Sequence, residues 1–232
     1  MNILKILTSG PVINFFTVII GTAIGLLIKK GIPNRVRTTL MTAMALCVLY
    51  IGVTGLFQED VNILAIIFCS ASGAVIGELI DLDKMINNLG LKLESSFKNK
   101  YGKIAEGFIA ATLLFCVGAM TVVGSVEAGI KGDNSTLYSK SVIDCVTSLC
   151  LASSLGIGVV FSAFSVLAIE GGIALLANFI APVLSDASIN HMSVIGSLLI
   201  IALSLNMLGI TKIKVMNYTP ALILPLLLFL KV

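Results

Sequence analysis

The sequence predicts an all-α integral membrane protein with seven or eight transmembrane helices. Hydrophobic residues make up 57% of the 232 residues and charged residues only 12%, whereas a soluble domain carries about a quarter charged residues. The mean hydropathy is +1.08. Most of the chain falls into apolar stretches close to the ~20 residues that a helix needs to cross a bilayer. These predicted spans are residues 11–29, 38–57, 62–80, 104–124, 141–159, 160–182, 192–211 and a short 216–230.

The polar remainder of the chain is too short for a soluble catalytic domain. The first ten residues lack a cleavage pattern, so we interpret residues 11–29 as a permanent helix and not as a signal peptide. All five cysteines fall within predicted spans, where they behave as small apolar side chains. The single histidine, His191, has no potential metal ligands near it in the sequence. With no catalytic or phosphate-binding motif present, we expect no enzyme activity, cofactor, metal site or nucleic-acid partner.

The distribution of Lys and Arg predicts the orientation, because cytoplasmic loops are enriched in basic residues. The loops after the first, third and seventh predicted spans hold eleven of the fifteen basic residues, and the loop after the second span holds none. Placing the basic loops inside puts the N-terminus outside. The longest polar segment, residues 79–103, has apolar residues at helical spacing. This pattern indicates an amphipathic helix that lies either on the inner membrane surface or against the protein itself.

A short internal match predicts a repeat. Residues 70–78 and 162–170 align without a gap, and both begin with Ser-Ala and end with a glutamate. Three spans in each half is an odd number, so the halves would enter the membrane in opposite directions, as in many secondary transporters. The predicted units are residues 1–81 as the first three-helix repeat, 82–103 as a cytoplasmic amphipathic connector, 104–184 as the second, inverted three-helix repeat, and 185–232 as C-terminal transmembrane helices.

Glycines interrupt the apolar sequence at two places. Gly118 and Gly124 lie within the fourth predicted span, and Gly156 and Gly158 separate the fifth from the sixth. Interruptions in corresponding positions of two halves favour backbone breaks that line a transport site. The alternatives are close packing of helices through small residues or, at Gly156 and Gly158, a tight turn.

Two glutamates in apolar surroundings are the sharpest candidates for a functional site. Glu170 lies deep inside a predicted span, where an acidic residue costs about 2.5–3.5 kcal/mol on insertion scales and usually marks an ion or proton pathway. The alternative is a protonated carboxyl that bonds to neighbouring backbone. Its counterpart in the repeat, Glu78, lies nearer the inner interface and is either part of the same pathway or a solvated charge.

The fifth predicted span carries a polar face. Lys140 and Asp144 stand four residues apart and therefore share one side of a helix, and Ser148 extends that side. This face either lines a substrate path or holds an ion pair at the outer interface. Amide side chains in the first and seventh spans either contact a ligand or join helices. The candidate substrate- or ion-binding residues are Glu170, Lys140, Asp144, Glu78, Ser148, Asn14 and Asn206.

The chain also resembles a known family over nearly its whole length. The residues that carry the resemblance are Val12-Ile-Asn14, Gly77-Glu78, Glu106-Gly-Phe108, Phe115-Cys-Val-Gly118, Gly124-Ser125, Gly132-Asp133, Lys140-Ser141 with Asp144, and Leu155-Gly-Ile-Gly-Val159. They are similar to the bacterial membrane family called "domain of unknown function 554". The resemblance implies a multi-pass protein of the bacterial cytoplasmic (inner) membrane, in a family often described as transport proteins. It implies no particular substrate and no catalytic residues.

Two functional hypotheses follow. The first is a secondary transporter or channel for a small polar solute or ion, with Glu170 as its proton or cation site. The alternative is a non-transporting membrane scaffold or sensor that acts through its cytoplasmic connector. The expected partners are the lipid bilayer and the solute or ion, and the oligomeric state, a homo-oligomer included, stays open. The hypotheses differ in whether Glu170, Asp144 and Lys140 converge on one enclosed site.

Overall fold

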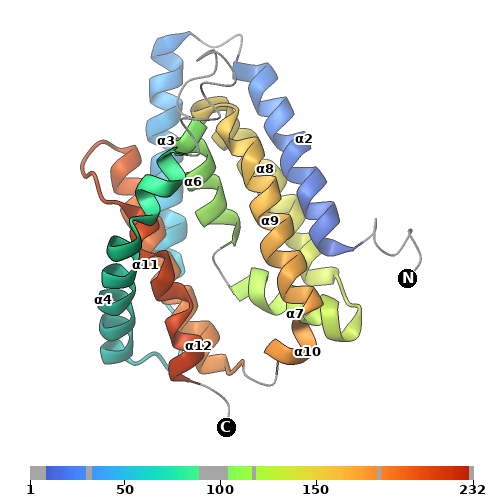
Figure 1. Cartoon of the computed structure of the whole chain (residues 1–232). Helices are drawn as coiled ribbons and strands as arrows, with labels where there is room; N and C mark the ends of the chain where they lie inside the picture. The colour runs from blue at the N-terminus through green and yellow to red at the C-terminus, as the bar shows by residue number, and fades with distance from the viewer. Residues whose placement is uncertain (1–8, 30–32, 89–103, 117–118, 182–183, 230–232) are drawn as a thin grey trace.

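The computed structural model describes residues 9–29, 33–88, 104–116, 119–181 and 184–229. Within these ranges the chain is a bundle of helices without any strand (Figure 1). A short helix over residues 82–88 follows α4. The main helices are α2 (Gly10–Lys29), α3 (Asn34–Thr54), α4 (Ile63–Ile80), α6 (Ile104–Cys116), α7 (Ala119–Lys131), α8 (Ser135–Leu155), α9 (Gly158–Leu175), α10 (Ala177–Ile180), α11 (Asp186–Met207), the 3₁₀ helix η1 (Val215–Leu222) and α12 (Leu224–Leu228).

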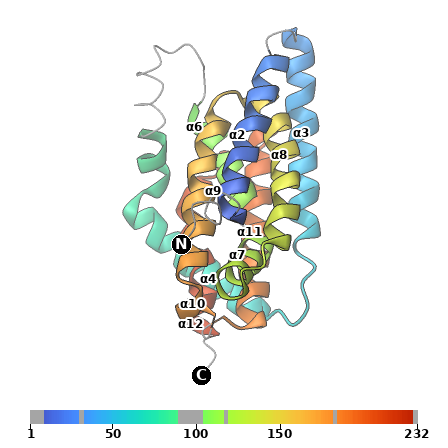
Figure 2. The ribbon, with the colours of Figure 1, turned by 90° about the vertical axis from the view of Figure 1, so that its right-hand side faces the viewer.

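Helix α8 is the central helix of the bundle. It packs against α2, α3, α6, α7 and α9, and Figure 2 shows α2 running alongside it. The apolar core lies where these helices meet, and it includes Val18 of α2, Phe115 of α6, Leu151 of α8 and Val159 of α9. Because α8 is enclosed on most sides, polar side chains on it need not face lipid.

Two glycines bring α2 into direct contact with α8. Gly21 and Gly25 are four residues apart, and a Cβ atom on them would lie 2.2 Å from the carbonyl oxygen of Cys145 and 2.3 Å from that of Leu149. Only hydrogen atoms fit at this distance, so the two backbones touch, as in other membrane helix pairs with small residues at this spacing. Asn134, before α8, also accepts a 2.7 Å hydrogen bond from the backbone N–H of Gly10. These contacts set the register between the two helices.

The helices support the expected class of membrane protein, with fewer clear spans than the sequence predicts. Four helices are long and apolar enough to cross a bilayer, namely α2, α4, α9 and α11, and a fifth span results if α6 and α7 count as one. Helix α8 does not meet that test, because it carries Lys140, Asp144 and many hydroxyl groups. Its 21 residues are nevertheless about 31 Å long at 1.5 Å per residue.

Three of the predicted spans are not single helices. The span predicted at 160–182 is α9 followed by the four-residue helix α10. The span predicted at 104–124 consists of α6 and α7, which are bent by 60° relative to each other. Gly118 falls between them, outside the described residues, and Gly124 lies inside α7 against Leu137 rather than at a break. The short span predicted at 216–230 is the 3₁₀ helix η1 followed by the five-residue helix α12. Pro220 lies within η1, and proline disfavours a continuous α-helix because it has no backbone N–H.

The glycines between α8 and α9 form a tight turn. Gly156 ends α8 with a φ of 90°, a left-handed conformation that glycine adopts without a steric penalty. Gly158 begins α9 and packs so closely on α6 that a Cβ atom there would lie 2.1 Å from the carbonyl oxygen of Ile104. Figure 1 shows this turn at one end of the bundle, so it does not interrupt a helix halfway along.

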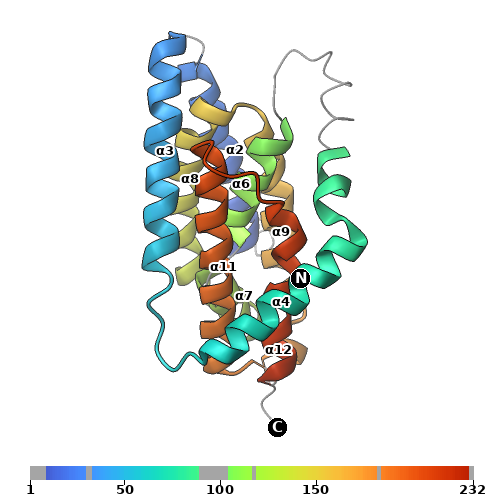
Figure 3. The same ribbon diagram turned by 90° about the vertical axis from the view of Figure 1, so that its left-hand side faces the viewer.

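Helix α4 lies apart from the α2–α8–α9 assembly. It crosses the side of the bundle obliquely and packs on η1, α11 and α12 (Figure 3). Its predicted counterpart α9 instead packs on α2, α6 and α7. The proposed inverted repeat therefore stays a prediction from the sequence, and the connector predicted at 82–103 is described only as far as residue 88.

We expect that replacing Gly21 by Ala separates α2 from α8. The added methyl group would overlap the Cys145 carbonyl and the Ser148 hydroxyl, and overpacking of this kind costs about 1–3 kcal/mol. The melting temperature of the purified protein should fall. It is measured with a fluorogenic maleimide, which reacts with buried cysteines as thermal unfolding exposes them. Gly171→Ala is the matched control, because nothing lies within 4 Å of its Cβ position. Equal melting temperatures for the two variants would contradict the close contact.

Candidate functional site

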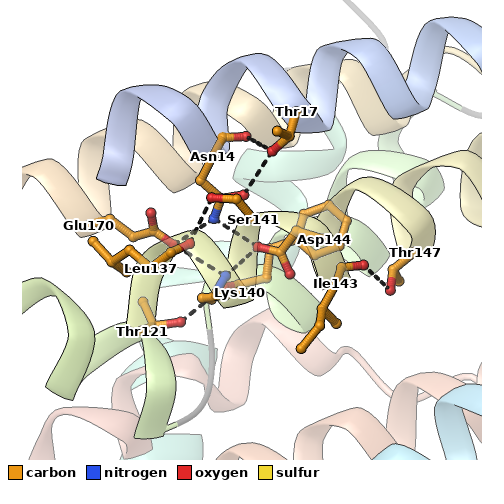
Figure 4. Close-up of polar contacts among 11 residues, drawn as sticks. Asn14, Thr17, Thr121, Leu137, Lys140, Ser141, Ile143, Asp144, Thr147 and Glu170 are labelled. Carbon is orange, nitrogen blue, oxygen red and sulfur yellow. Dashed lines mark hydrogen bonds and ion pairs between the residues drawn. The ribbon is translucent and has the colours of Figure 1, made fainter. Parts of the chain in front are cut away.

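Four of the seven candidate residues meet in one buried group, which we call the charge cluster: Asn14, Lys140, Asp144 and Glu170. They come from three helices, α2, α8 and α9 (Figure 4). The Lys140 ammonium lies 3.1 Å from Oε1 of Glu170 and also contacts Oδ2 of Asp144. Asn14 Nδ2 donates 2.8 Å hydrogen bonds to the same two carboxylate oxygens. Each of these two oxygens therefore binds both the ammonium and the amide.

The charge cluster is closed off from the surface of the protein. Asn14 and Glu170 are 0% exposed, Asp144 4% and Lys140 6%. Removing one partner from a buried ion pair of this kind is expected to cost about 3–5 kcal/mol, because it leaves an uncompensated charge. The stability of each buried charge in the cluster therefore depends on its partners.

Local hydrogen bonds leave the helix surface around the cluster free of competing donors. Ser141, beside Lys140 on α8, donates its hydroxyl to the backbone oxygen of Leu137 at 2.7 Å. Thr17 on α2 donates to the backbone oxygen of Asn14 at 2.9 Å and to the side-chain oxygen of the same residue at 3.4 Å. Both hydroxyls thus bind within their own helix and not to Asp144 or Glu170, so the carboxylates are held by the ammonium and the amide.

One carboxylate oxygen of the cluster is buried without a hydrogen-bond partner in the described part of the chain. Oε2 of Glu170 is buried and forms no hydrogen bond with any described residue. The hydroxyl of Ser125 on α7, a helix that packs on α9, is also buried without a partner among the described residues. Most buried polar atoms in proteins are paired. An unpaired carboxylate oxygen inside a membrane protein is therefore a position where a proton, a water or a ligand can bind.

The break between α6 and α7 lies beside the cluster. Thr121 in the first turn of α7 donates a 3.0 Å hydrogen bond to the carbonyl oxygen of Phe115 near the end of α6 (Figure 4). Cys116, the last residue of α6, is close enough to interact electrostatically with Lys140, Asp144 and Glu170. Helix ends that meet charged groups inside the membrane are typical of transport sites.

A cavity of about 570 Å³ lies on the other side of Cys116. It is open on one side and is lined by residues of α4, α6, α7, α9, α11 and η1, and its walls are almost entirely apolar. Ser193 and Thr112 add hydroxyl groups to the lining, and the hydroxyl of Ser193 is unpaired among the described residues. No residue of the charge cluster lines the cavity. The two sites are therefore neighbours, with Cys116 forming part of the wall between them.

Glu78 lies outside the charge cluster. Its carboxylate accepts hydrogen bonds from Lys214 at 2.7 Å and Asn217 at 2.6 Å, and 60% of its side chain is exposed. The Glu78 carboxylate holds the pKa of Lys214 above its usual range. Nearby, burial raises the pKa of Asp83, whose backbone N–H donates to Asn217. Glu78 is therefore a largely exposed carboxylate paired with Lys214 and Asn217, away from the charge cluster.

The last two candidate residues, Ser148 and Asn206, form hydrogen bonds with backbone groups and lie outside the charge cluster. Ser148 lies one turn beyond Asp144 against Gly21, and its hydroxyl donates to the backbone oxygen of Cys145. The side chain of Asn206 closes the turn after α11, where it donates to the carbonyl oxygen of Ile213 and accepts from the backbone N–H of the same residue. Neither residue contacts a charged group of the cluster.

Comparison with known proteins places the chain in a family. The family described as "Protein of unknown function (DUF554)" matches residues 9–230. The chain belongs to this family. It is 32% identical to the uncharacterized membrane protein YdfK of Bacillus subtilis over 219 residues, which cover 93% of each chain. It is also 32% identical to the uncharacterized protein YqgA of Escherichia coli over 220 residues, again 93% of each chain. No solved structure matches it.

The family assignment confirms the resemblance drawn from the sequence, and the name of the Bacillus relative agrees with the apolar helices. Sequence reasoning overlooked two features of the site. The first is the Gly21–Gly25 pair, which a search for small residues four apart in an apolar helix would have found. The second is Thr121, whose role depends on a helix break that the hydropathy of residues 104–124 does not reveal.

We expect that Asn14→Leu destabilises the protein, although leucine is more apolar than asparagine. The substitution removes two hydrogen bonds to carboxylates, each worth about 1.5–3 kcal/mol when the acceptor is charged. Asn190→Leu is the matched control, because Asn190 forms an exposed hydrogen bond to the Glu59 backbone. Thermal unfolding in detergent should show a clear loss of stability for Asn14→Leu only. A melting temperature at or above that of the unmodified protein would show that the amide does not hold the carboxylates.

Proposed function

We propose that the protein is a secondary transporter or channel for a small polar solute or ion. The observation that carries this proposal is the charge cluster, in which Lys140 contacts both Asp144 and Glu170 in the interior of a membrane protein. Ionisable residues at such positions are rare, and they mark ion or substrate pathways more often than they serve stability. A structural role alone would be met at lower cost by apolar side chains of similar volume.

Two neighbouring features support the same proposal. The α6–α7 break places the ends of two half-helices beside the charge cluster, and the cavity of about 570 Å³ begins at Cys116. A solute that entered the cavity would therefore have to pass only a thin wall to reach the charges. Movement of α6 relative to α7 is the simplest way to open that wall, because the two helices are bent by 60° relative to each other and do not form one straight span.

The arrangement of the ends supports the proposed orientation. The end of α2, the start of α3 and the segment after α11 lie toward the same end of the bundle (Figure 1), and these segments contain Lys29, Arg35, Lys212 and Lys214. We propose that this end faces the cytoplasm and that the N-terminus lies outside. The inverted repeat and a count of seven or eight spans belong to the same proposal.

The first test compares Glu170→Gln with Glu78→Gln. Solutes that raise the melting temperature of the purified protein identify candidate ligands, because binding to the folded state alone stabilises it. Uptake of such a solute into liposomes is then measured together with the internal pH. Glu170→Gln keeps its shape and one hydrogen-bond acceptor but cannot ionise, so uptake should fall at least tenfold. Glu78→Gln should transport at nearly the normal rate, since Glu78 lies outside the cluster.

Two results would argue against the proposal in this experiment. One is normal uptake by Glu170→Gln, which would remove the charge cluster from the pathway. The other is the failure of a broad set of small polar solutes and ions both to stabilise the protein and to cross the membrane.

The orientation is tested with single cysteines added at the two ends of the bundle. Glu59→Cys lies in the exposed segment between α3 and α4, and Thr38→Cys lies at an exposed position in the second turn of α3. A membrane-impermeant maleimide added to intact cells should label Glu59→Cys and leave Thr38→Cys unlabelled until the cells are opened. The unmodified protein, with its five native cysteines, gives the background. The reverse pattern would place the N-terminus inside.

A further inference from the structure

The charge cluster resembles a cation-binding site in which the bound cation is a side chain of the protein, the Lys140 ammonium. Two carboxylates from adjacent helices face each other, and the Lys140 ammonium contacts both of them. In ion-coupled transporters a bound metal cation takes such a position, held by acidic side chains and by carbonyl groups at the ends of broken helices. Here the side chain of Lys140, anchored to α8, fills it.

The charges of the cluster do not balance. Asp144 and Glu170 supply two negative charges and Lys140 supplies one positive charge, while Asn14 is neutral. Among the described residues, the groups that face Glu170 from the helices packed on α9 add no further cation. Cys116 of α6 interacts with it electrostatically, and Thr121 and Ser125 of α7 carry hydroxyl groups. One more positive charge would make the buried cluster neutral.

The geometry favours a proton as that charge. A proton needs a single oxygen atom, and Oε2 of Glu170 is buried and unpaired among the described residues. A sodium ion needs several oxygen ligands, and it would have to share the space between the carboxylates with the Lys140 ammonium, which repels it. The proton that binds comes from water, and it leaves to water when the site opens.

We propose that the coupling ion of this protein is a proton carried on Glu170, and that Lys140 acts as a built-in cation that takes the place of sodium or potassium. This inference rests on the proposed function and makes it more specific. It also assigns roles to the two carboxylates. Asp144 stays paired with Lys140, and Glu170 gains and loses the proton.

The experiment measures cation-dependent stability, which does not require a known substrate. The melting temperature is recorded in sodium, potassium or N-methyl-D-glucamine chloride at equal ionic strength. Lys140→Ala removes the built-in cation and leaves a space between two carboxylates, so sodium or potassium should raise its melting temperature by several degrees relative to N-methyl-D-glucamine. The unmodified protein and the control Lys140→Arg, which keeps the positive charge, should not distinguish the three salts.

Lys140→Ala could unfold, because its carboxylates lose their main partner. Lys140→Gln is therefore tested alongside it, since the amide still donates to the carboxylates without carrying charge, and it should show the same cation dependence. The proposal fails if folded Lys140→Ala or Lys140→Gln does not distinguish the salts. It also fails if sodium or potassium specifically stabilises the unmodified protein.

Protonation is followed separately by infrared difference spectroscopy between high and low pH. The unmodified protein should show the carbonyl band of a buried protonated carboxyl group at low pH, and Glu170→Gln should lack that band. If the band persists in Glu170→Gln and disappears in Asp144→Asn, the assignment of the proton to Glu170 is wrong. Neither measurement depends on uptake, so a failure here is distinguishable from a failure of the transport proposal.

Discussion

The contact of Lys140 with Asp144 and Glu170 is the interaction on which the rest of the bundle depends. Three ionisable groups can stay inside a membrane only if they satisfy one another and if no lipid reaches them. The helix that carries two of them, α8, accordingly packs against five others. One of these, α2, approaches α8 at backbone contact, which its glycines allow, and contributes Asn14 as the neutral donor between the carboxylates.

Much of the fold could be predicted from local sequence, because the bilayer imposes the length and the hydropathy of each helix. The predicted bounds of α2 and α4 match the structure to within one residue, and α11 begins and ends several residues earlier than predicted. The pairing of Lys140 with Asp144 also follows from local spacing. The approach of Asn14 to Glu170 does not, because the two residues are 156 positions apart. Hydropathy identifies a buried polar residue but does not reveal its partner.

The local sequence match between residues 70–78 and 162–170 does not predict the surroundings of Glu78. Residues 70–78 and 162–170 share a sequence pattern, yet α4 packs beside η1 and α9 packs beside α2. Glu78 therefore meets Lys214 and Asn217 near the surface, whereas Glu170 is fully enclosed. The bend between α6 and α7 is not visible in the hydropathy either, because an apolar helix and two apolar half-helices have the same average hydropathy. Gly118 is the sequence feature that favours a backbone break in this stretch.

The pairing of α2 with α8 has a consequence for the biosynthesis of the protein. Asn14 and Asp144 are separated by 130 residues, and a ribosome adds about 5–20 residues per second, so α2 is made on the order of ten seconds before its partner. During that interval Asn14 has no carboxylate to bind. Helix α8 then arrives with Lys140 and Asp144, which make it poorly suited to enter lipid alone. The newly made chain therefore has to keep α2 close to the site of insertion. Helix α8 then enters the membrane beside the glycine surface of α2 on which it packs.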